Sequence, residues 1–230
     1  MKVGDKLWVP QSRLLEEIEA PRYHIAEDGR KYPAIGGGSG VTGTWSEVLF
    51  ASIADGTALN TFTAEASLLQ GLNEQPVIPA FFFPTQGGVG KTLRLVARGV
   101  LGSTATPTFT FFVRIGTTSA VVTGASLGQT AAITTGSGVT NQFWELECDI
   151  ICRAAGIGTG NTTIQCAGLV YSPGFASPFT YSVTPAASAT VWTATMDQSV
   201  TQYIMVSAAC GTSNLANTIQ LKQCILLGLN

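Results

Sequence analysis

Strict alternation of apolar and acidic side chains in one segment is the feature that most constrains how this chain folds. Residues 144–150, WELECDI, alternate without exception, and the acidic positions are Glu145, Glu147 and Asp149. Because successive side chains of a β-strand point to opposite faces, this period of two predicts a strand with one buried face.

The same alternation recurs along the chain after residue 41. The segment 108–115, TFTFFVRI, places four apolar side chains on one face: Phe109, Phe111, Val113 and Ile115. In 217–225, NTIQLKQCI, one predicted face holds Ile219, Leu221, Gln223 and Ile225, and the opposite face holds Thr218, Gln220, Lys222 and Cys224. Weaker strands between turn-forming residues are predicted at 45–53, 78–83, 92–101, 162–171, 189–195 and 202–210. About nine strands and no long helix predict an all-β, antiparallel jelly-roll β-sandwich.

The N-terminal residues have a different composition. Residues 1–31 carry 12 of the chain's 26 charged side chains, and GGGSG at 36–40 is a flexible linker by composition. Within this part, 12–21 predicts at most a short helix that begins after Ser12 and ends before Pro21. We therefore divide the chain into an N-terminal docking arm with its linker, 1–40, and a sandwich domain, 41–230. The candidate partner-binding residues of the arm are apolar: Trp8, Leu14, Leu15 and Ile18.

Charge and hydrophobicity exclude two classes of partner. The net charge is -2 and only 11% of residues are charged, so no basic field attracts nucleic acid. No segment of about 20 residues is apolar enough to span a bilayer, and the N-terminus lacks the apolar region of a signal peptide. We expect no nucleic acid and no membrane among the partners, and synthesis in a cytoplasm.

The cysteines predict neither a metal site nor a disulfide framework. Their number is odd, five, and no two are spaced as CxxC: Cys148, Cys152, Cys166, Cys210 and Cys224. Each lies in an apolar, strand-like segment. They are predicted to be free, buried thiols.

Residues 84–92, PTQGGVGKT, look like the phosphate-binding loop of a nucleotide hydrolase. The Walker A pattern requires Gly where Thr85 stands, and the variant KGGVGKT requires Lys where Gln86 stands. After Lys91 the alternation predicts a strand, broken by Gly99, whereas a phosphate loop needs a helix N-terminus. The segment is predicted to be a turn, and no cofactor is expected.

Other catalytic arrangements also lack support. The only histidine, His24, lies in the charged arm, outside the expected core, so a Ser-His-acid triad is not predicted. The carboxylate row on 144–150 would suit calcium or a glycosidase pair, but a solvated strand face is favoured. Arg94, Arg98 and Arg114 also lie on polar strand faces and are expected to form cross-strand ion pairs. We expect no catalytic residue, no metal and no enzyme activity.

Three segments resemble accessory virion proteins of tailed bacteriophages: 90–116, 140–156 and 217–230. The resemblance implies a jelly roll, commonly a homotrimer, found as a capsid decoration (cement) protein or at the tip of a head or tail fibre. It therefore implies a structural protein on the capsid surface that bridges subunits of the major capsid protein or other virion subunits. The alternative is a fibre or receptor-binding module that recognises host surface glycans through loops at one end of the roll. A carbohydrate-active enzyme that uses Glu145 is a third hypothesis.

Overall fold

The computed structural model describes residues 23–25, 31–33, 46–83, 91–119, 124–177, 179–185 and 194–229. The chain separates into two compact units, Met1–Thr44 and Trp45–Asn230. In the first unit the described residues form two short antiparallel strands, β1 (Tyr23–Ile25) and β2 (Lys31–Pro33). The helix predicted over 12–21 and the four candidate partner-binding residues, Trp8, Leu14, Leu15 and Ile18, lie outside the described residues.

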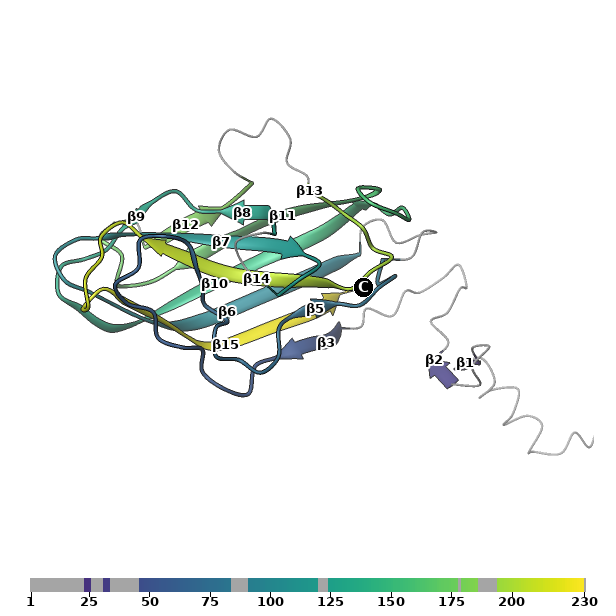
Figure 1. The fold of residues 1–230 in the computed structure, drawn as a ribbon, viewed down its shortest axis with the longest axis horizontal. Helices are drawn as coiled ribbons and strands as arrows, with labels where there is room; N and C mark the ends of the chain where they lie inside the picture. The colour runs from purple at the N-terminus through teal and green to yellow at the C-terminus, as the bar shows by residue number, and fades with distance from the viewer. Residues whose placement is uncertain are drawn as a thin grey trace, which may run out of the picture. The chain divides into compact units, whose positions relative to one another are not determined.

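Two antiparallel sheets make up the second unit (Figure 1). The larger sheet has the order β12 (Thr180–Val183), β11 (Thr162–Tyr171), β10 (Val139–Ala154), β6 (Thr92–Ser103), β15 (Thr218–Leu229) and β3 (Ser46–Ala51), with β13 (Ala194–Met196) also paired to β11. The smaller sheet has the order β4 (Ala66–Ser67), β14 (Gln202–Cys210), β7 (Thr108–Gly116) and β8 (Ala125–Gln129), with β5 (Val77–Ile78) on β14 and β9 (Ile133–Thr134) on β7. No helix occurs among the described residues, so none of them forms a helix that could cross a membrane.

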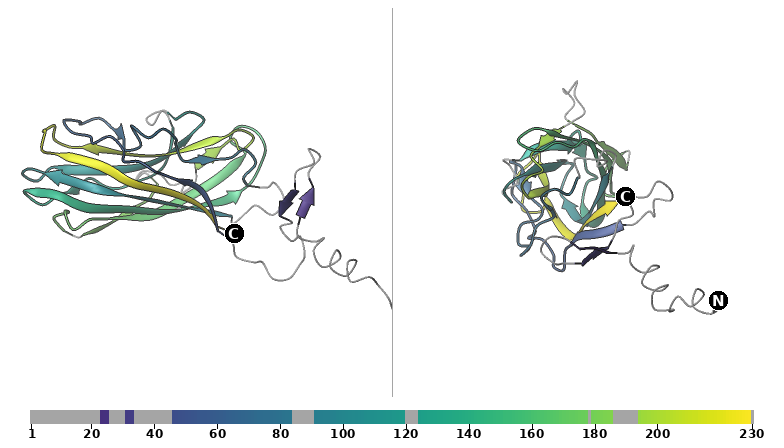
Figure 2. Two further views of the ribbon diagram at one scale, coloured as in Figure 1. Left: turned by 90° about the horizontal axis from the view of Figure 1, so that it is seen from below. Right: turned by 90° about the vertical axis from the view of Figure 1, so that its right-hand side faces the viewer.

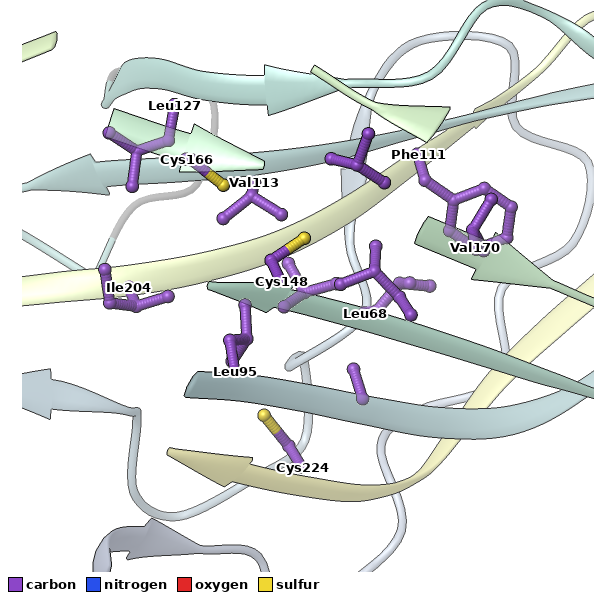
Figure 3. Packing of buried hydrophobic residues seen from close by; sticks show 14 of the residues in the cluster. Leu68, Leu95, Phe111, Val113, Leu127, Cys148, Cys166, Val170, Ile204 and Cys224 are labelled. Atoms are coloured by element: carbon purple, nitrogen blue, oxygen red, sulfur yellow. The ribbon is translucent and has the colours of Figure 1, made fainter. Parts of the chain in front are cut away.

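The strands of the two sheets surround a common interior (Figure 2), and the side chains on their inner faces form one apolar core there (Figure 3). Alternate residues of β7 and β10 are buried, as the period of two predicts. Phe111 of β7 and Trp144 of β10 meet across the core, with ring centroids 5.4 Å apart. The predicted antiparallel β-sandwich is therefore confirmed.

The expectation that Gly99 breaks its strand is wrong. β6 continues through Gly99 to Ser103, paired with β10 on one side and β15 on the other. A Cβ atom at Gly99 would lie 2.9 Å from the Trp144 ring and would overlap the carbonyl oxygen of Gln220. The glycine is needed because the neighbouring strands β10 and β15 approach closely here, not because the chain turns.

The predicted face assignment of β15 is correct up to Lys222 and wrong from Gln223 onward. The register with β6 shifts between Leu221 and Gln223, which marks a β-bulge. A bulge adds one residue, so the side chains after it change faces. Cys224 is consequently buried in the core and Gln223 is exposed, the reverse of the prediction.

The weaker strand predictions agree with the structure to different degrees. The segment predicted at 78–83 contains only the end of β5, followed by a turn in which the Phe82 amide donates to the Pro79 carbonyl at 3.2 Å. Of the segment predicted at 189–195, only the start of β13 is described. By contrast, the predictions at 162–171 and 202–210 coincide with β11 and β14.

Candidate functional site

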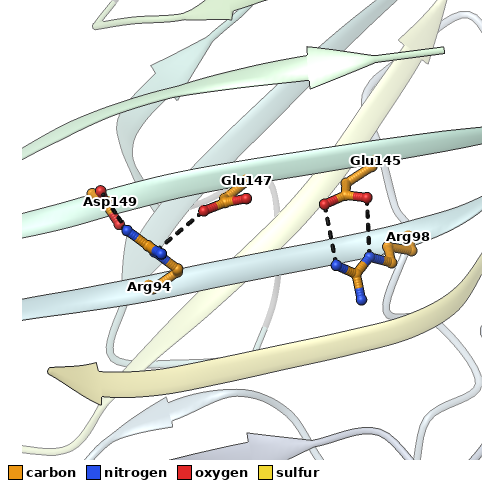
Figure 4. A network of polar contacts seen from close by, with 5 residues as sticks. All are labelled: Arg94, Arg98, Glu145, Glu147 and Asp149. Atoms are coloured by element: carbon orange, nitrogen blue, oxygen red, sulfur yellow. Dashed lines mark hydrogen bonds and ion pairs between the residues drawn. The ribbon is translucent and has the colours of Figure 1, made fainter. Parts of the chain in front are cut away.

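The outer face of the larger sheet carries the acidic row that the alternation predicts. Asp149 of β10 lies opposite Arg94 of β6, and Glu145 lies opposite Arg98 (Figure 4). The residue between them, Glu147, lies opposite the aliphatic Val96. The sheet register therefore brings three carboxylates and two guanidinium groups together on two neighbouring strands.

Arginine side chains from β6 pair with all three carboxylates. Arg94 Nε donates to Asp149 Oδ1 at 2.8 Å and lies 3.3 Å from Glu147 Oε1, and Arg98 Nε lies 3.1 Å from Glu145 Oε2. The hydrogen bond to Asp149 is the main cause of the raised pKa of Arg94. The predicted cross-strand ion pairs are confirmed at both arginines.

On its other side, the acidic row faces three uncharged residues of β11. Ala167 lies opposite Asp149, Leu169 opposite Glu147 and Tyr171 opposite Glu145. Together with Thr180 of β12, these two columns line a shallow hollow of about 430 Å³, which we call the outer groove. Its side chains include Leu169, which is 52% exposed, and Tyr171, which is 42% exposed.

Two more exposed aromatic residues lie close to the Tyr171 end of this groove. Phe143 precedes the acidic row on β10, and Phe179 precedes β12; both are exposed. Ser172 joins these segments, because its hydroxyl donates to the Phe143 carbonyl at 2.7 Å and its amide donates to the Phe179 carbonyl at 3.0 Å. Ser172, the residue after Tyr171, thus links the backbones of Phe143 and Phe179 beside this end of the groove.

The groove combines hydrogen-bond acceptors with exposed apolar surface. A hydroxylated ligand could donate to the carboxylates while a less polar part of it lies against Leu169 and Tyr171. The calcium hypothesis receives no support, because no group of three or more His, Cys, Asp or Glu side chains among the described residues is placed to hold a metal ion. Sequence reasoning singled out the carboxylates but missed Leu169 and Tyr171, although both occupy outward positions where the alternation calls for polar residues.

A second hollow, of about 560 Å³, lies among loops that follow β7, β10 and β13. Its lining includes Thr117, Thr159 and Asp197. Hydrogen bonds from the Ser199 side chain and backbone to the Asp197 carboxylate are the main causes of its lowered pKa. Asp197 is therefore used to hold its own turn in place.

The third predicted arginine, Arg114, pairs on the outer face of the smaller sheet. Its Nε and Nη2 donate to the two carboxylate oxygens of Glu65 at 2.7 and 2.6 Å, and Ser207 donates to the same carboxylate at 2.5 Å. Burial alone would raise the pKa of Glu65, but the hydrogen bonds from Arg114 and Ser207 and the charge of Arg114 together lower it. This contact ties the long connection between β3 and β6 to the sheet.

Lys91, the lysine of the loop-like motif, has structural contacts. Its Nζ donates to the Phe82 carbonyl at 3.0 Å and lies 3.7 Å from the centroid of the Phe82 ring. Burial lowers its pKa. A strand, β6, follows it directly, as predicted, while residues 84–90 lie outside the described residues.

All five cysteines are free and buried, as predicted. The hydrogen bond with Cys166, followed by burial, raises the pKa of Cys148, and burial raises the pKa of Cys224 to about 12. The remaining predicted residue, His24, lies in β1 of the N-terminal unit.

Comparisons with known proteins leave the chain without an assigned family. No protein-family profile matches it, and no curated protein matches it at a significant level. One solved structure that it resembles is the CBM2 module of the evolved Dit protein of Lactobacillus casei BL23 phage J-1. The identity is 12%, the match covers 81% of this chain and 97% of that module, and the TM-score is 0.34. A likeness at that score carries no argument about function.

Proposed function

We propose that this chain is a non-enzymatic structural protein of a tailed-bacteriophage particle and that its sandwich recognises host surface glycans through the outer groove. The observation that carries the proposal is the meeting of Leu169 and Tyr171 with Glu145 and Glu147 in one open groove. The resemblance of the strand sequences to accessory virion proteins supports the phage setting.

The physical case rests on the two kinds of surface that a pyranose ring presents. Its C–H face is apolar and packs against an exposed aromatic or aliphatic side chain, as Tyr171 and Leu169 provide. Its hydroxyl groups donate hydrogen bonds, and a carboxylate oxygen is an acceptor that strengthens such a bond. A hollow of about 430 Å³ has room for a short saccharide, and its shallow form suits a chain that lies along the surface.

Glycan-array binding by the full chain, followed by calorimetric titration of the best ligand, tests this function. Tyr171→Ala and Leu169→Ala should each weaken binding at least fivefold, because each removes apolar packing that contributes roughly 1 kcal/mol to the binding free energy. Leu215→Ala is the matched control, because Leu215 is even more exposed, at 73%, and does not line the groove. Binding that survives both groove substitutions, or no binding to any glycan, would contradict the proposal.

Capsid decoration is a second proposal, favoured by the division of the chain into two units. The first unit, Met1–Thr44, carries the predicted docking residues, including Trp8 and Leu14, ahead of a sandwich that is compact by itself. In this role a homotrimer on the capsid surface would bridge neighbouring subunits of the major capsid protein.

Deleting residues 1–35 should abolish co-sedimentation with capsids and leave the sandwich folded; binding by the shortened chain would rule the role out. Light scattering would measure the expected trimer.

A further inference from the structure

We propose that the glycan recognised in the outer groove carries a protonated amine, as glucosamine does, and that Glu147 binds this ammonium group. The inference rests on the glycan-binding function proposed above and specifies its ligand class. It follows from where the charges lie in the groove.

Among the described residues, those that line the groove include carboxylates and no cationic side chain. Glu145, Glu147 and Asp149 line it, whereas Arg94 and Arg98 belong to β6, on the far side of the acidic row. No residue of β11 or β12 is charged. The next cation on β10, Arg153, lies four residues beyond Asp149, or about 13 Å along an extended strand.

Glu147 is the carboxylate that the arginines neutralise least. Two guanidinium groups serve three carboxylates, and Arg94 lies closer to Asp149, at 2.8 Å, than to Glu147, at 3.3 Å. Arg98 is held by Glu145 and also donates to Gln223 at 3.0 Å. The direct cross-strand neighbours of Glu147 are Val96 and Leu169, which offer it no hydrogen bond. Its side chain is 46% exposed at the centre of the row.

This arrangement determines which sugars the groove favours. An ammonium group beside Glu147 would complete the charge balance of the row, at three cations to three carboxylates. An anionic sugar would place its charge beside the surplus carboxylate and would be repelled. A neutral sugar would still donate hydrogen bonds but would gain no charge pairing. Leu169, directly opposite Glu147, would contact the ring that carries the amine.

Calorimetric titration of the full chain with three oligosaccharides tests the inference: a glucosamine oligomer, its N-acetylated counterpart of equal length, and a uronic-acid oligomer. The measurements are made at mildly acidic pH, where the glucosamine amines are protonated. The glucosamine oligomer should bind roughly fivefold tighter than the acetylated one, because a half-exposed ion pair contributes a free energy of that size. The uronic-acid oligomer should bind most weakly of the three. Added salt should reduce this preference.

Glu147→Gln should abolish the preference for the amine and bring the affinities of the glucosamine and acetylated oligomers within twofold of each other, because the amide carries no charge to pair with the ammonium group. Glu74→Gln is the control, because Glu74 is exposed and lies outside the groove, and it should preserve the preference. Equal or tighter binding of the acetylated or uronic-acid oligomer would overturn the inference and leave glycan binding intact. Failure of every oligosaccharide and every arrayed glycan to bind would instead overturn the proposed function.

Discussion

Asp149 lies directly opposite Arg94 across β10 and β6, and Arg94 Nε donates to Asp149 Oδ1 at 2.8 Å. Four residues along both strands, Glu145 and Arg98 repeat the arrangement. Because the strands are antiparallel, both pairs form only in this register; a slip of one residue would turn the arginines toward the core. The ion pairs thus specify strand alignment as well as surface charge.

Charge reversal at Arg94 should destabilise the sandwich modestly. Arg94→Glu removes the pair with Asp149 and places a third carboxylate between Glu147 and Asp149. Since these side chains are about 40% exposed, we expect a loss of about 1 kcal/mol in the free energy of unfolding, smaller at high salt. Urea unfolding at low and high salt measures it.

The double variant Arg94→Glu with Asp149→Arg restores opposite charges at that pair and should recover part of the loss. Lys222→Glu is the comparison, because the single exposed pair of Lys222 with Asp55 should contribute less. Unchanged stability of Arg94→Glu would show that the pair has no energetic role.

The pair of Glu65 and Arg114 should contribute more, because its side chains are only 14% and 19% exposed. Glu65→Gln keeps the shape but removes the charge from a carboxylate that accepts three hydrogen bonds. We expect a loss of roughly 1–3 kcal/mol at neutral pH, the range for hydrogen bonds to charged groups. Denaturant unfolding of both proteins at pH 7 measures the difference.

The same substitution should change the response to acid. The pKa of Glu65 is lower in the folded protein than its ordinary value of 4.5, so the unfolded chain binds the proton more readily. The stabilisation is complete above pH 4.5 or so and is lost as the pH falls through the folded pKa. The stability difference between the natural protein and Glu65→Gln should therefore shrink below about pH 4. A difference that is constant from pH 7 to pH 3 would contradict this assignment.

How far the sequence predicts the fold is clear from β10 and β15. In β10 the alternation is unbroken, so Trp144, Cys148 and Ile150 are all inside as predicted. In β15 the prediction fails from Gln223 onward, because a bulge depends on pairing with β6 and has no local sequence signal. The need for glycine at position 99 has no local sequence signal either, because it comes from the close approach of Gln220 and Trp144 on the two neighbouring strands.

The candidate site was predictable in part. The alternation predicts the acidic row, and the polar strand faces of Arg94 and Arg98 predict cross-strand ion pairs, but their carboxylate partners do not follow from the sequence. The groove itself depends on β11 lying beside β10, and strand order does not follow from alternation. Leu169 and Tyr171 belong to the site only because β11 pairs with β10 and places them beside the acidic row.

The five thiols should be unreactive in the folded protein. All are buried, the pKa of Cys224 is about 12, and the pKa of Cys148 is raised by Cys166 and by burial, so the reactive thiolate is scarce. A disulfide reagent at pH 8 should label none of them within minutes and all five after denaturation. Rapid labelling of any cysteine under native conditions would show that its strand opens readily.

Gly99→Ala should be among the most damaging single-methyl additions to the sandwich. The new Cβ would overlap the Gln220 carbonyl oxygen and lie 2.9 Å from the Trp144 ring, on a strand paired on both sides. Neither neighbour can move alone, because Trp144 is fully buried and its Nε1 donates to the Val100 carbonyl at 3.2 Å. We expect a loss of about 3 kcal/mol, at the upper end for overpacking, with a lower Tm by calorimetry.

Gly136→Ala is the matched control for this prediction. Its added Cβ would meet the Val139 side chain at 3.3 Å, and a side-chain atom at the first residue of β10 can shift where a paired backbone cannot. That variant should lose less than about 1 kcal/mol. A melting temperature of Gly99→Ala within a degree of that of Gly136→Ala would contradict the prediction. It would mean that β6 and β15 can separate locally to make room for the methyl group, so close packing would not be the reason for a glycine at position 99.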